Sequence, residues 1–244
     1  MHVKVLNGRV VERAKARGID VLVYAPHFTR LPTIRKRAER HSDDELLVVP
    51  GREIFTGNWQ NRRHLLAIGL SEPVPDFISF EGALSTLADQ AAALCVPHPT
   101  LLNVSFGRPE IRAYADHIDA VESYNVKSPP HVNSRAKEII EEAGLPSFGS
   151  SYAHLRGSVG EAWTEFDADI ESEADLVDAL VSVADRQVVH RSGPRHRFWN
   201  AAEFAHLGYE NSWGKVDRLF LSGTEPTHPD HIAYKGQFDD VAVY

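Results

Sequence analysis

The sequence predicts an α/β fold in which a mainly parallel sheet, covered by helices, closes into a TIM-like barrel. The first observation is a regular alternation of short apolar runs with amphipathic stretches, which indicates about seven strand–helix units. The second is that so many units favour a closed barrel over an open sheet. The third is the composition of the 244 residues, 43% hydrophobic and 25% charged, which is typical of a soluble globular protein with a sizeable core.

In the first half of the chain, strands and helices are expected to alternate with short connections. The apolar runs predict strands at 2–6, 20–25, 45–49 and 64–70. A helix is predicted at 8–18, because Val10, Val11 and Ala14 fall on one helical face, and a basic helix is predicted at 33–41. These elements supply the first part of the barrel.

The second half repeats the same order. Helices are predicted at 80–94, 109–118, 133–144 and 172–185, and the third of these stops at Gly144. Strands follow them at 95–99, 119–125, 146–151 and 186–191. After residue 190 the chain becomes rich in Gly, Pro, Trp and Tyr with little periodicity. We therefore expect a barrel domain over 1–190 and a loop-rich C-terminal extension, 191–244, packed on it.

Charge and cysteine content exclude several classes of function. The chain has 34 acidic and 26 basic residues and a formal charge of −8, which disfavours sequence-independent binding to nucleic acid or to an anionic membrane. The single cysteine, Cys95, permits neither an internal disulfide nor a cysteine zinc site. Because the sequence shows no signal-peptide pattern and no long apolar run, the expected location is the cytoplasm.

Thirteen histidines beside one cysteine and one methionine suggest a metal centre, because imidazole is a common ligand for borderline metals. Polar side chains follow the apolar runs at the points where strands should end, where α/β barrels build their sites. They are His27, Glu53, His98, Glu122, Asn125 and His154. Two further histidines, His2 and His64, begin apolar runs.

Each of these residues also has a purely structural interpretation. A single histidine near a strand end is more often a hydrogen-bonded structural side chain than a ligand. The prolines on both sides of His98 fix its direction, which suits a ligand and also suits an ordinary turn. An acid such as Glu53 is usually solvated or paired with a lysine. The agreement of several strand ends is what favours a site.

Two clusters in the extension leave alternatives open. The segment HRSGPRHRF at 190–198 is basic, and it is either a solvated loop or a lip for an anionic substrate. The segment THPDH places His228 and His231 three residues apart, but Pro229 makes a plain turn the simpler interpretation.

The order of short motifs resembles that of the PHP family, the polymerase and histidinol phosphatase superfamily. They are HVK, APHF, GREI, HLLAIG, VPHP, AVESYN and SYAH, followed by a glycine, over residues 2 to about 190. The resemblance implies a distorted seven-stranded (β/α) barrel of the PHP type with a cluster of up to three metal ions. It also implies metal-ligand positions at His2, His27, Glu53, His64, His98 and His154.

Three departures from the family pattern reduce the number of ions expected. Lys4 stands where the family has the second histidine of HxH, Pro26 where it has the aspartate of TDH, and Tyr152 where it has the aspartate of SDxH. A protonated lysine cannot ligate a metal, and its ammonium could take the place of an ion. One or two divalent ions (Zn, Mn or Fe) are therefore expected more than three. The triplet of Glu53, His64 and His98 is the most complete remnant.

The resemblance implies a metal-dependent phosphoesterase that acts through a metal-bound hydroxide on a small phosphorylated substrate or a nucleotide. His27 and His154 are the candidate catalytic acid and base. The candidate substrate-binding residues are Arg30, Arg52, Arg156, Lys4 and Tyr152. One alternative is a catalytically impaired PHP-like pseudoenzyme that binds a ligand or a partner. A barrel subunit of a ribonucleoprotein is disfavoured by the acidic balance. Metal content distinguishes hydrolase from pseudoenzyme.

Overall fold

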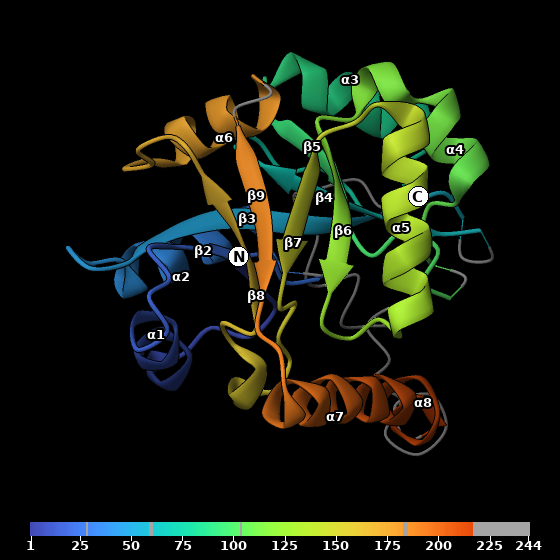
Figure 1. Cartoon of the computed structure of the whole chain (residues 1–244). Coiled ribbons are helices and arrows are strands. Elements are labelled where there is room, and N and C mark those ends of the chain that lie inside the picture. Colours follow the sequence, from blue (N-terminus) through green and yellow to red (C-terminus); the bar gives the residue numbers. More distant parts are fainter. Residues whose placement is uncertain (28, 59–60, 103, 183–184, 217–244) are drawn as a thin grey trace.

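Seven strands in sequential order form one sheet around the centre of the molecule (Figure 1). The computed structural model describes residues 1–27, 29–58, 61–102, 104–182 and 185–216. The two edges of the sheet meet at a bridge between Val3, in the first strand, and Ala153, just after the seventh. The predicted seven-stranded barrel is therefore confirmed.

One strand of the barrel runs against the others. β4 pairs antiparallel with β3 and with β5, and the other neighbouring strands pair in parallel. The strands are β1 (His2–Val3), β2 (Val21–Tyr24), β3 (Leu47–Thr56), β4 (Arg63–Ile68), β5 (Ala93–Val96), β6 (Ala120–Asn125) and β7 (Ser147–Ser150). Because β4 is reversed, its first residues lie at the edge of the sheet where its neighbours end.

Six helices cover the described barrel. They are α1 (Gly8–Lys15), α2 (Leu31–His41), α3 (Phe80–Asp89), α4 (Arg108–Ala113), α5 (Pro130–Ala143) and α6 (Glu173–Val181). Helix α1 buries Val10 and Ala14 of its predicted face, with Val11 half-buried. Asn7 caps α1 by accepting a hydrogen bond from the backbone N–H of Val10. Gly144 ends α5 in the left-handed conformation, at φ 65°, which favours glycine.

Side chains that alternate along the strands fill one end of the barrel with apolar groups. Val49 on β3, Leu66 on β4 and Cys95 on β5 pack together with Leu176 and Leu180 of α6, and all five are buried. Glu53 lies four residues after Val49 on the same strand face, and His64 lies two residues before Leu66. Period-two alternation therefore places both polar side chains in the barrel above this apolar layer.

A two-stranded antiparallel sheet of β8 (Ala162–Phe166) and β9 (Arg186–His190), with α6 between them in the chain, packs beside β7. The sequence did not predict β8. Gly149 lets this small sheet approach, because a Cβ at this position would lie 2.3 Å from Cγ1 of Val188. The backbone N–H of Gly149 also donates to Oγ1 of Thr164, at 2.9 Å.

The described part of the extension is mainly helical, where the sequence predicted loops. α7 (Pro194–Asn211) lies at the end toward which β6 and β7 point (Figure 1), and α8 (Trp213–Val216) follows. Buried polar groups hold α7, so its apolar periodicity is weak. His196 contacts the hydroxyl of Tyr124 at 2.7 Å and Glu161 at 3.0 Å. His228 and His231 lie outside the described residues.

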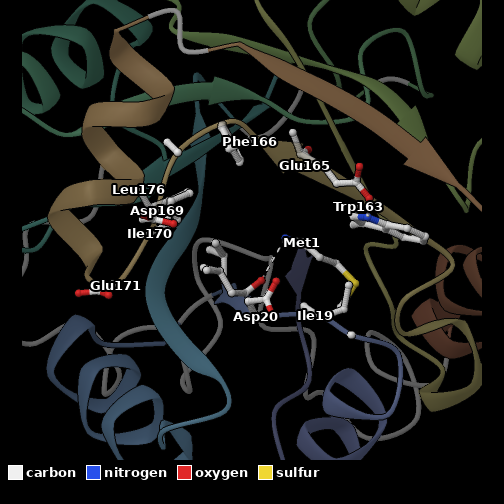
Figure 2. A pocket seen from close by; sticks show the side chains of 15 residues that line it. Met1, Ile19, Asp20, Trp163, Glu165, Phe166, Asp169, Ile170, Glu171 and Leu176 are labelled. Atoms are coloured by element: carbon white, nitrogen blue, oxygen red, sulfur yellow. Dashed lines mark hydrogen bonds between the residues drawn. The ribbon is translucent and has the colours of Figure 1, made fainter.

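Among the described residues, no helix is long and apolar enough to cross a membrane. β8 and the start of β2 border a pocket of about 390 Å³, with Met1, Asp20, Trp163 and Glu165 on its walls (Figure 2). Asp20 directly precedes β2, so the pocket lies at the amino-terminal end of that strand, opposite its carboxyl edge.

We predict that breaking the buried pair of Arg52 and Asp76 destabilises the chain strongly. Nη2 of Arg52 lies 2.6 Å from Oδ2 of Asp76, and both side chains are buried. Replacing Asp76→Asn leaves the guanidinium charge without its partner and should lower the free energy of unfolding by about 3–5 kcal/mol. Urea unfolding followed by circular dichroism measures this change.

The control is Arg108→Gln, which removes an exposed ion pair with Glu142 and should change the urea midpoint far less. If Asp76→Asn unfolds at the same urea concentration as the parent chain, the buried pair does not have the proposed role.

Candidate functional site

A buried carboxylate, that of Glu53, lies at the centre of the polar end of the barrel. Its side chain is fully buried, although an ionised carboxylate is costly to bury without partners. The hydroxyl of Tyr152 donates to its Oε2 at 2.6 Å. The remaining partners of this carboxylate are histidines and a lysine, which come from different strand ends.

His64 and His98 both contact the same oxygen of Glu53. Nδ1 of His64 lies 2.6 Å from Oε1, and Nε2 of His98 lies 3.0 Å from it. The two ring nitrogens are 3.4 Å apart. His64 reaches this position because β4 is antiparallel, so the residue that begins its apolar run lies at the carboxyl edge of β3.

The orientation of His98 is set by its surroundings. Oγ of Ser105 donates to the carbonyl of Leu101 at 2.7 Å, so it accepts from Nδ1–H of His98 at 2.8 Å. The other ring nitrogen, Nε2, faces a carboxylate oxygen of Glu53 at 3.0 Å, so a proton or a cation bridges these two atoms. An imidazole whose second nitrogen is held by a hydrogen bond is typical of metal ligands.

Backbone geometry supports this arrangement at two residues. His98 has φ 34° and Tyr152 has φ 42°, both in the left-handed region that side chains other than glycine rarely adopt. Such positions cost about 1–3 kcal/mol each and gather at functional sites. The backbone N–H of His98 donates to Oε2 of Glu122 at 2.6 Å, which fixes the turn.

His27 and Lys4 lie on the other oxygen of Glu53. Nδ1 of His27 donates to the backbone carbonyl of Glu53 at 3.3 Å, so its Nε2 carries the lone pair, 3.7 Å from Oε2. Nζ of Lys4 contacts this Nε2 and lies 3.7 Å from the same oxygen. The lysine ammonium therefore occupies a cation position between a histidine and the carboxylate.

The ionisation states at this centre are those that a metal requires. Burial alone would raise the pKa of Glu53, but Lys4, His27 and His64 together hold that pKa well below its usual value. Burial lowers the pKa of His64 to about 4 and that of His2 to about 3. The centre thus offers a carboxylate and neutral imidazoles at neutral pH.

A second group of potential ligands lies at the barrel mouth and includes α7. Nδ1 of His154 lies 3.1 Å from Oε2 of Glu210, and Nδ1 of His206 lies 3.6 Å from that oxygen. Nζ of Lys127 lies 2.5 Å from Nδ1 of His154. Burial, together with the charge of Lys4, lowers the pKa of Lys127 to about 7. Nζ of Lys4 and Nζ of Lys127 lie 4.7 and 4.4 Å from the ring centroid of Tyr152, which thus contacts both groups.

Within the described residues, two groups of histidine and carboxylate donors have ligand atoms within 4.8 Å of one another: His27, Glu53 and His64, and His154, His206 and Glu210. His98 joins the first group, because its Nε2 lies 3.0 Å from Glu53 and 3.4 Å from His64. The acidic side chains of the pocket in Figure 2 are not among them. The barrel mouth is therefore the candidate site.

Sequence reasoning missed Lys127, His206 and Glu210. Lys127 follows the end of β6 by two residues, so the same strand-end rule could have found it. His206 and Glu210 lie on α7. The sequence pattern did not predict this helix, because polar side chains on its buried face weaken the apolar periodicity. Glu203 on the same helix accepts from the backbone N–H groups of His154 and Leu155, at 3.1 and 2.9 Å, and so fixes α7 to the loop after β7.

Three predicted arginines lie apart from the centre, whereas His2 lies beside it. Arg52 points to the opposite side of β3 from Glu53, and its guanidinium forms an ion pair with Asp76. We therefore do not include Arg52 among the proposed substrate-binding residues. Arg30 is the half-buried N-cap residue of α2. Arg156 lines a separate pocket between α1 and α7. His2 is buried with its ring 4.8 Å from that of Tyr152, and its nitrogens have no hydrogen-bond partner among described residues.

Glu122 and Asn125, which also follow the strand-end rule, stabilise the site. Besides the N–H of His98, Glu122 accepts from Nδ2 of Asn125 at 2.8 Å and from Oγ of Ser150 at 2.7 Å. Burial raises the pKa of this carboxyl. With these donors around it, Glu122 holds the loop of His98 in place and is not turned toward Glu53.

Residues 130–182 match a family model described as PHP-associated. An uncharacterized protein of Methanocaldococcus jannaschii is 29% identical over 135 residues, which cover 52% of this chain and 55% of that protein. The match thus spans about half the length of this curated relative.

Several solved structures share the fold. PsfC from Pseudomonas syringae aligns with a TM-score of 0.61 at 16% identity, over 82% of this chain and 88% of that one. A two-domain protein of Bacteroides vulgatus, described as containing a predicted PHP-like metal-dependent phosphoesterase, aligns with a TM-score of 0.58 at 18% identity, over 78% and 63%. Endonuclease Q, in complex with a 27-mer duplex that carries an abasic lesion at the active site, aligns with a TM-score of 0.55 at 16% identity, over 76% and 55%.

We predict that the metal-free chain loses stability as the pH falls from 6.5 toward 4. Burial holds the pKa values of His2 and His154 at about 3 and that of His64 at about 4, below the value of 6.5 for an unfolded histidine. The unfolded chain therefore binds protons first, and each histidine should lower the free energy of unfolding by on the order of 1–2 kcal/mol between pH 6.5 and 5. Urea unfolding in EDTA at several pH values measures the slope.

His2→Phe should reduce this slope, because it removes one of the three groups. His117→Gln, at an exposed position, should leave it unchanged. A flat profile between pH 6.5 and 5 in the parent chain would show that these histidines are not held neutral.

Proposed function

We propose that this chain, a divergent member of the PHP superfamily, is a metal-dependent hydrolase, and specifically a phosphoesterase that acts on a small phosphorylated substrate or a nucleotide. The PHP-associated match at 130–182 and the PHP-like barrel support a hydrolase-type function. The observation that carries the proposal is the position of Nε2 of His98, 3.0 Å from a buried oxygen of Glu53, with Nδ1 of the same ring held by Ser105. Such an arrangement suits a divalent cation.

The donor set fits one divalent ion at Glu53, His64 and His98, and imidazole with carboxylate suits Zn, Mn or Fe. When bound, such an ion polarises a phosphoryl oxygen and lowers the pKa of a coordinated water. A second ion fits at His154, His206 and Glu210. His2, with its unpartnered nitrogens, stays a candidate ligand of the first. Lys4 already supplies positive charge beside Glu53, so we propose one or two ions.

The chain's own residues then bind substrate and move protons. Lys4 donates to a phosphoryl oxygen, and Tyr152 holds Glu53 in place through its hydroxyl. Burial and Lys4 hold the pKa of His27 well below its usual value, so His27 is neutral and suits the base role. Lys127, whose burial-lowered pKa is about 7, lies against His154 and suits donation of a proton to the leaving oxygen.

A second candidate function is a pseudoenzyme that binds an anionic ligand or a partner in the barrel mouth. The contact of the Lys4 ammonium with Nε2 of His27, beside Glu53, favours it. A cation built into the chain gives the site positive charge without a metal. In this case Lys4 and Lys127 would bind the ligand directly, and no reaction would follow.

We predict that the purified chain contains bound Zn, Mn or Fe and that Glu53→Gln and His98→Ala lose it. Both substitutions remove a proposed ligand, and Glu53→Gln nearly keeps the side-chain volume. Elemental analysis measures the metal, and generic phosphomonoester and phosphodiester substrates measure the activity, which should fall at least roughly 100-fold in both variants. His117→Gln serves as the control.

The hydrolase proposal is contradicted if the purified chain contains none of these metals and its melting temperature does not rise when they are added. Binding of an anionic ligand by the same metal-free chain would then favour the pseudoenzyme.

We also predict that Lys4→His increases the metal content by about one ion per chain, because it replaces an ammonium with a ligand beside His27 and Glu53. Lys4→Met removes the charge without adding a ligand and provides the comparison. Elemental analysis of chains dialysed against the same metal measures both. Equal metal content in the parent chain and Lys4→His would contradict the cation role of Lys4.

A further inference from the structure

A pocket with a strongly basic wall lies outside the Glu53 centre, between α1, the turn at Arg156–Ser158 and α7. It has a volume of about 600 Å³ and shares no lining residue with the Glu53 centre. Four arginines line it, from three separate segments of the chain: Arg9, Arg13, Arg156 and Arg195. Arg195 belongs to the basic segment 190–198. The sequence pattern allowed two interpretations of this segment, a solvated loop or a lip for an anionic substrate.

The positive charge of this pocket is not neutralised by the chain. Glu12 is the one acidic residue on its wall. Within the described ranges, none of the four arginines has a carboxylate within ion-pair distance, whereas the neighbouring Arg17 pairs with Glu161 at 2.8 Å. Such a concentration of charge is unexpected on a chain with a formal charge of −8. Repulsion among these groups is relieved when an anion binds.

The wall of this pocket is held in place by contacts of Arg13 and Trp199. Nη2 of Arg13 contacts the carbonyl of Gly157 at 3.5 Å, and Nε of the same side chain is buried without a partner among described residues. Trp199 lies against Gly157 so closely that a Cβ there would be 2.0 Å from its Cη2. The indole is therefore a fixed part of the wall, next to the arginines.

Two ligand features match this wall. A guanidinium donates two parallel hydrogen bonds to phosphate oxygens, so four arginines suit more than one phosphate group. An indole offers a flat face on which an aromatic base can stack. A nucleotide carries both features, whereas inorganic diphosphate carries one and a nucleoside the other.

We propose that this pocket is a binding site for a nucleotide with two or more phosphates, with the phosphates on Arg9, Arg13, Arg156 and Arg195 and the base on Trp199. Binding here is independent of the proposed hydrolysis, because no donor of either cation group lines the pocket. The pocket nevertheless adjoins the barrel mouth, since Arg156 follows His154 by two residues.

The test is calorimetric titration of the full chain in EDTA with ADP, inorganic diphosphate and adenosine. The parent chain should bind ADP more tightly than diphosphate and adenosine. The double variant Arg13→Gln, Arg195→Gln should weaken ADP binding by roughly tenfold or more. The matched control is Arg40→Gln, Arg135→Gln, which removes two exposed arginines on the outer faces of α2 and α5 and should not change binding.

Two further variants separate the outcomes. Arg156→Gln alters a single exposed side chain and should weaken ADP binding even if the double variant unfolds. Glu53→Gln should bind ADP like the parent chain, whether or not the proposed hydrolase function holds. The proposal is overturned if ADP does not bind, if Arg156→Gln binds it unchanged, if Glu53→Gln abolishes binding, or if diphosphate or adenosine binds as tightly as ADP.

Discussion

The burial of one carboxylate, that of Glu53, is the constraint on which the rest of the barrel mouth depends. A buried charge is tolerated when it is paired and hydrogen-bonded, and the chain meets this demand from four different strand ends. Tyr152 donates to one oxygen, His64 and His98 face the other, and Lys4 lies nearby. The reversal of β4 brings His64 to this point. The positive φ of His98 and Tyr152 is backbone strain that accompanies the arrangement.

Two lysines lie in the barrel mouth, one beside each group of potential ligands. Lys4 and Lys127 approach the ring of Tyr152, and each contacts a histidine that comes from the end of a different strand, His27 or His154. Within the described chain, the second group includes Glu210 of α7, so the extension contributes a side chain to the barrel mouth.

Much of the fold follows from periodicity, and part of the site follows from it too. The strand-end rule found His27, His98 and His154 because parallel strands end at one edge. Glu53 was found although it lies inside β3, which continues to Thr56 past the predicted end at residue 49. The same rule did not account for His64, since the direction of β4 depends on long-range pairing that a local pattern does not contain.

The helix α7 was missed for a different reason. Its buried face carries His196, Asn200 and Glu203, so the apolar spacing that marks most helices is weak. The pairing of Arg52 with Asp76 likewise joins residues whose proximity only the folded chain shows.

The central claim is that the carboxylate of Glu53, with His64 and His98, holds a divalent cation. Anomalous diffraction from crystals grown with Mn or Zn tests this most directly. The account predicts an anomalous peak within about 2.0–2.2 Å of Nε2 of His98 and of a carboxylate oxygen of Glu53. Crystals that bind the metal elsewhere but show no peak between these two residues, with the Lys4 ammonium still beside Glu53, would contradict it.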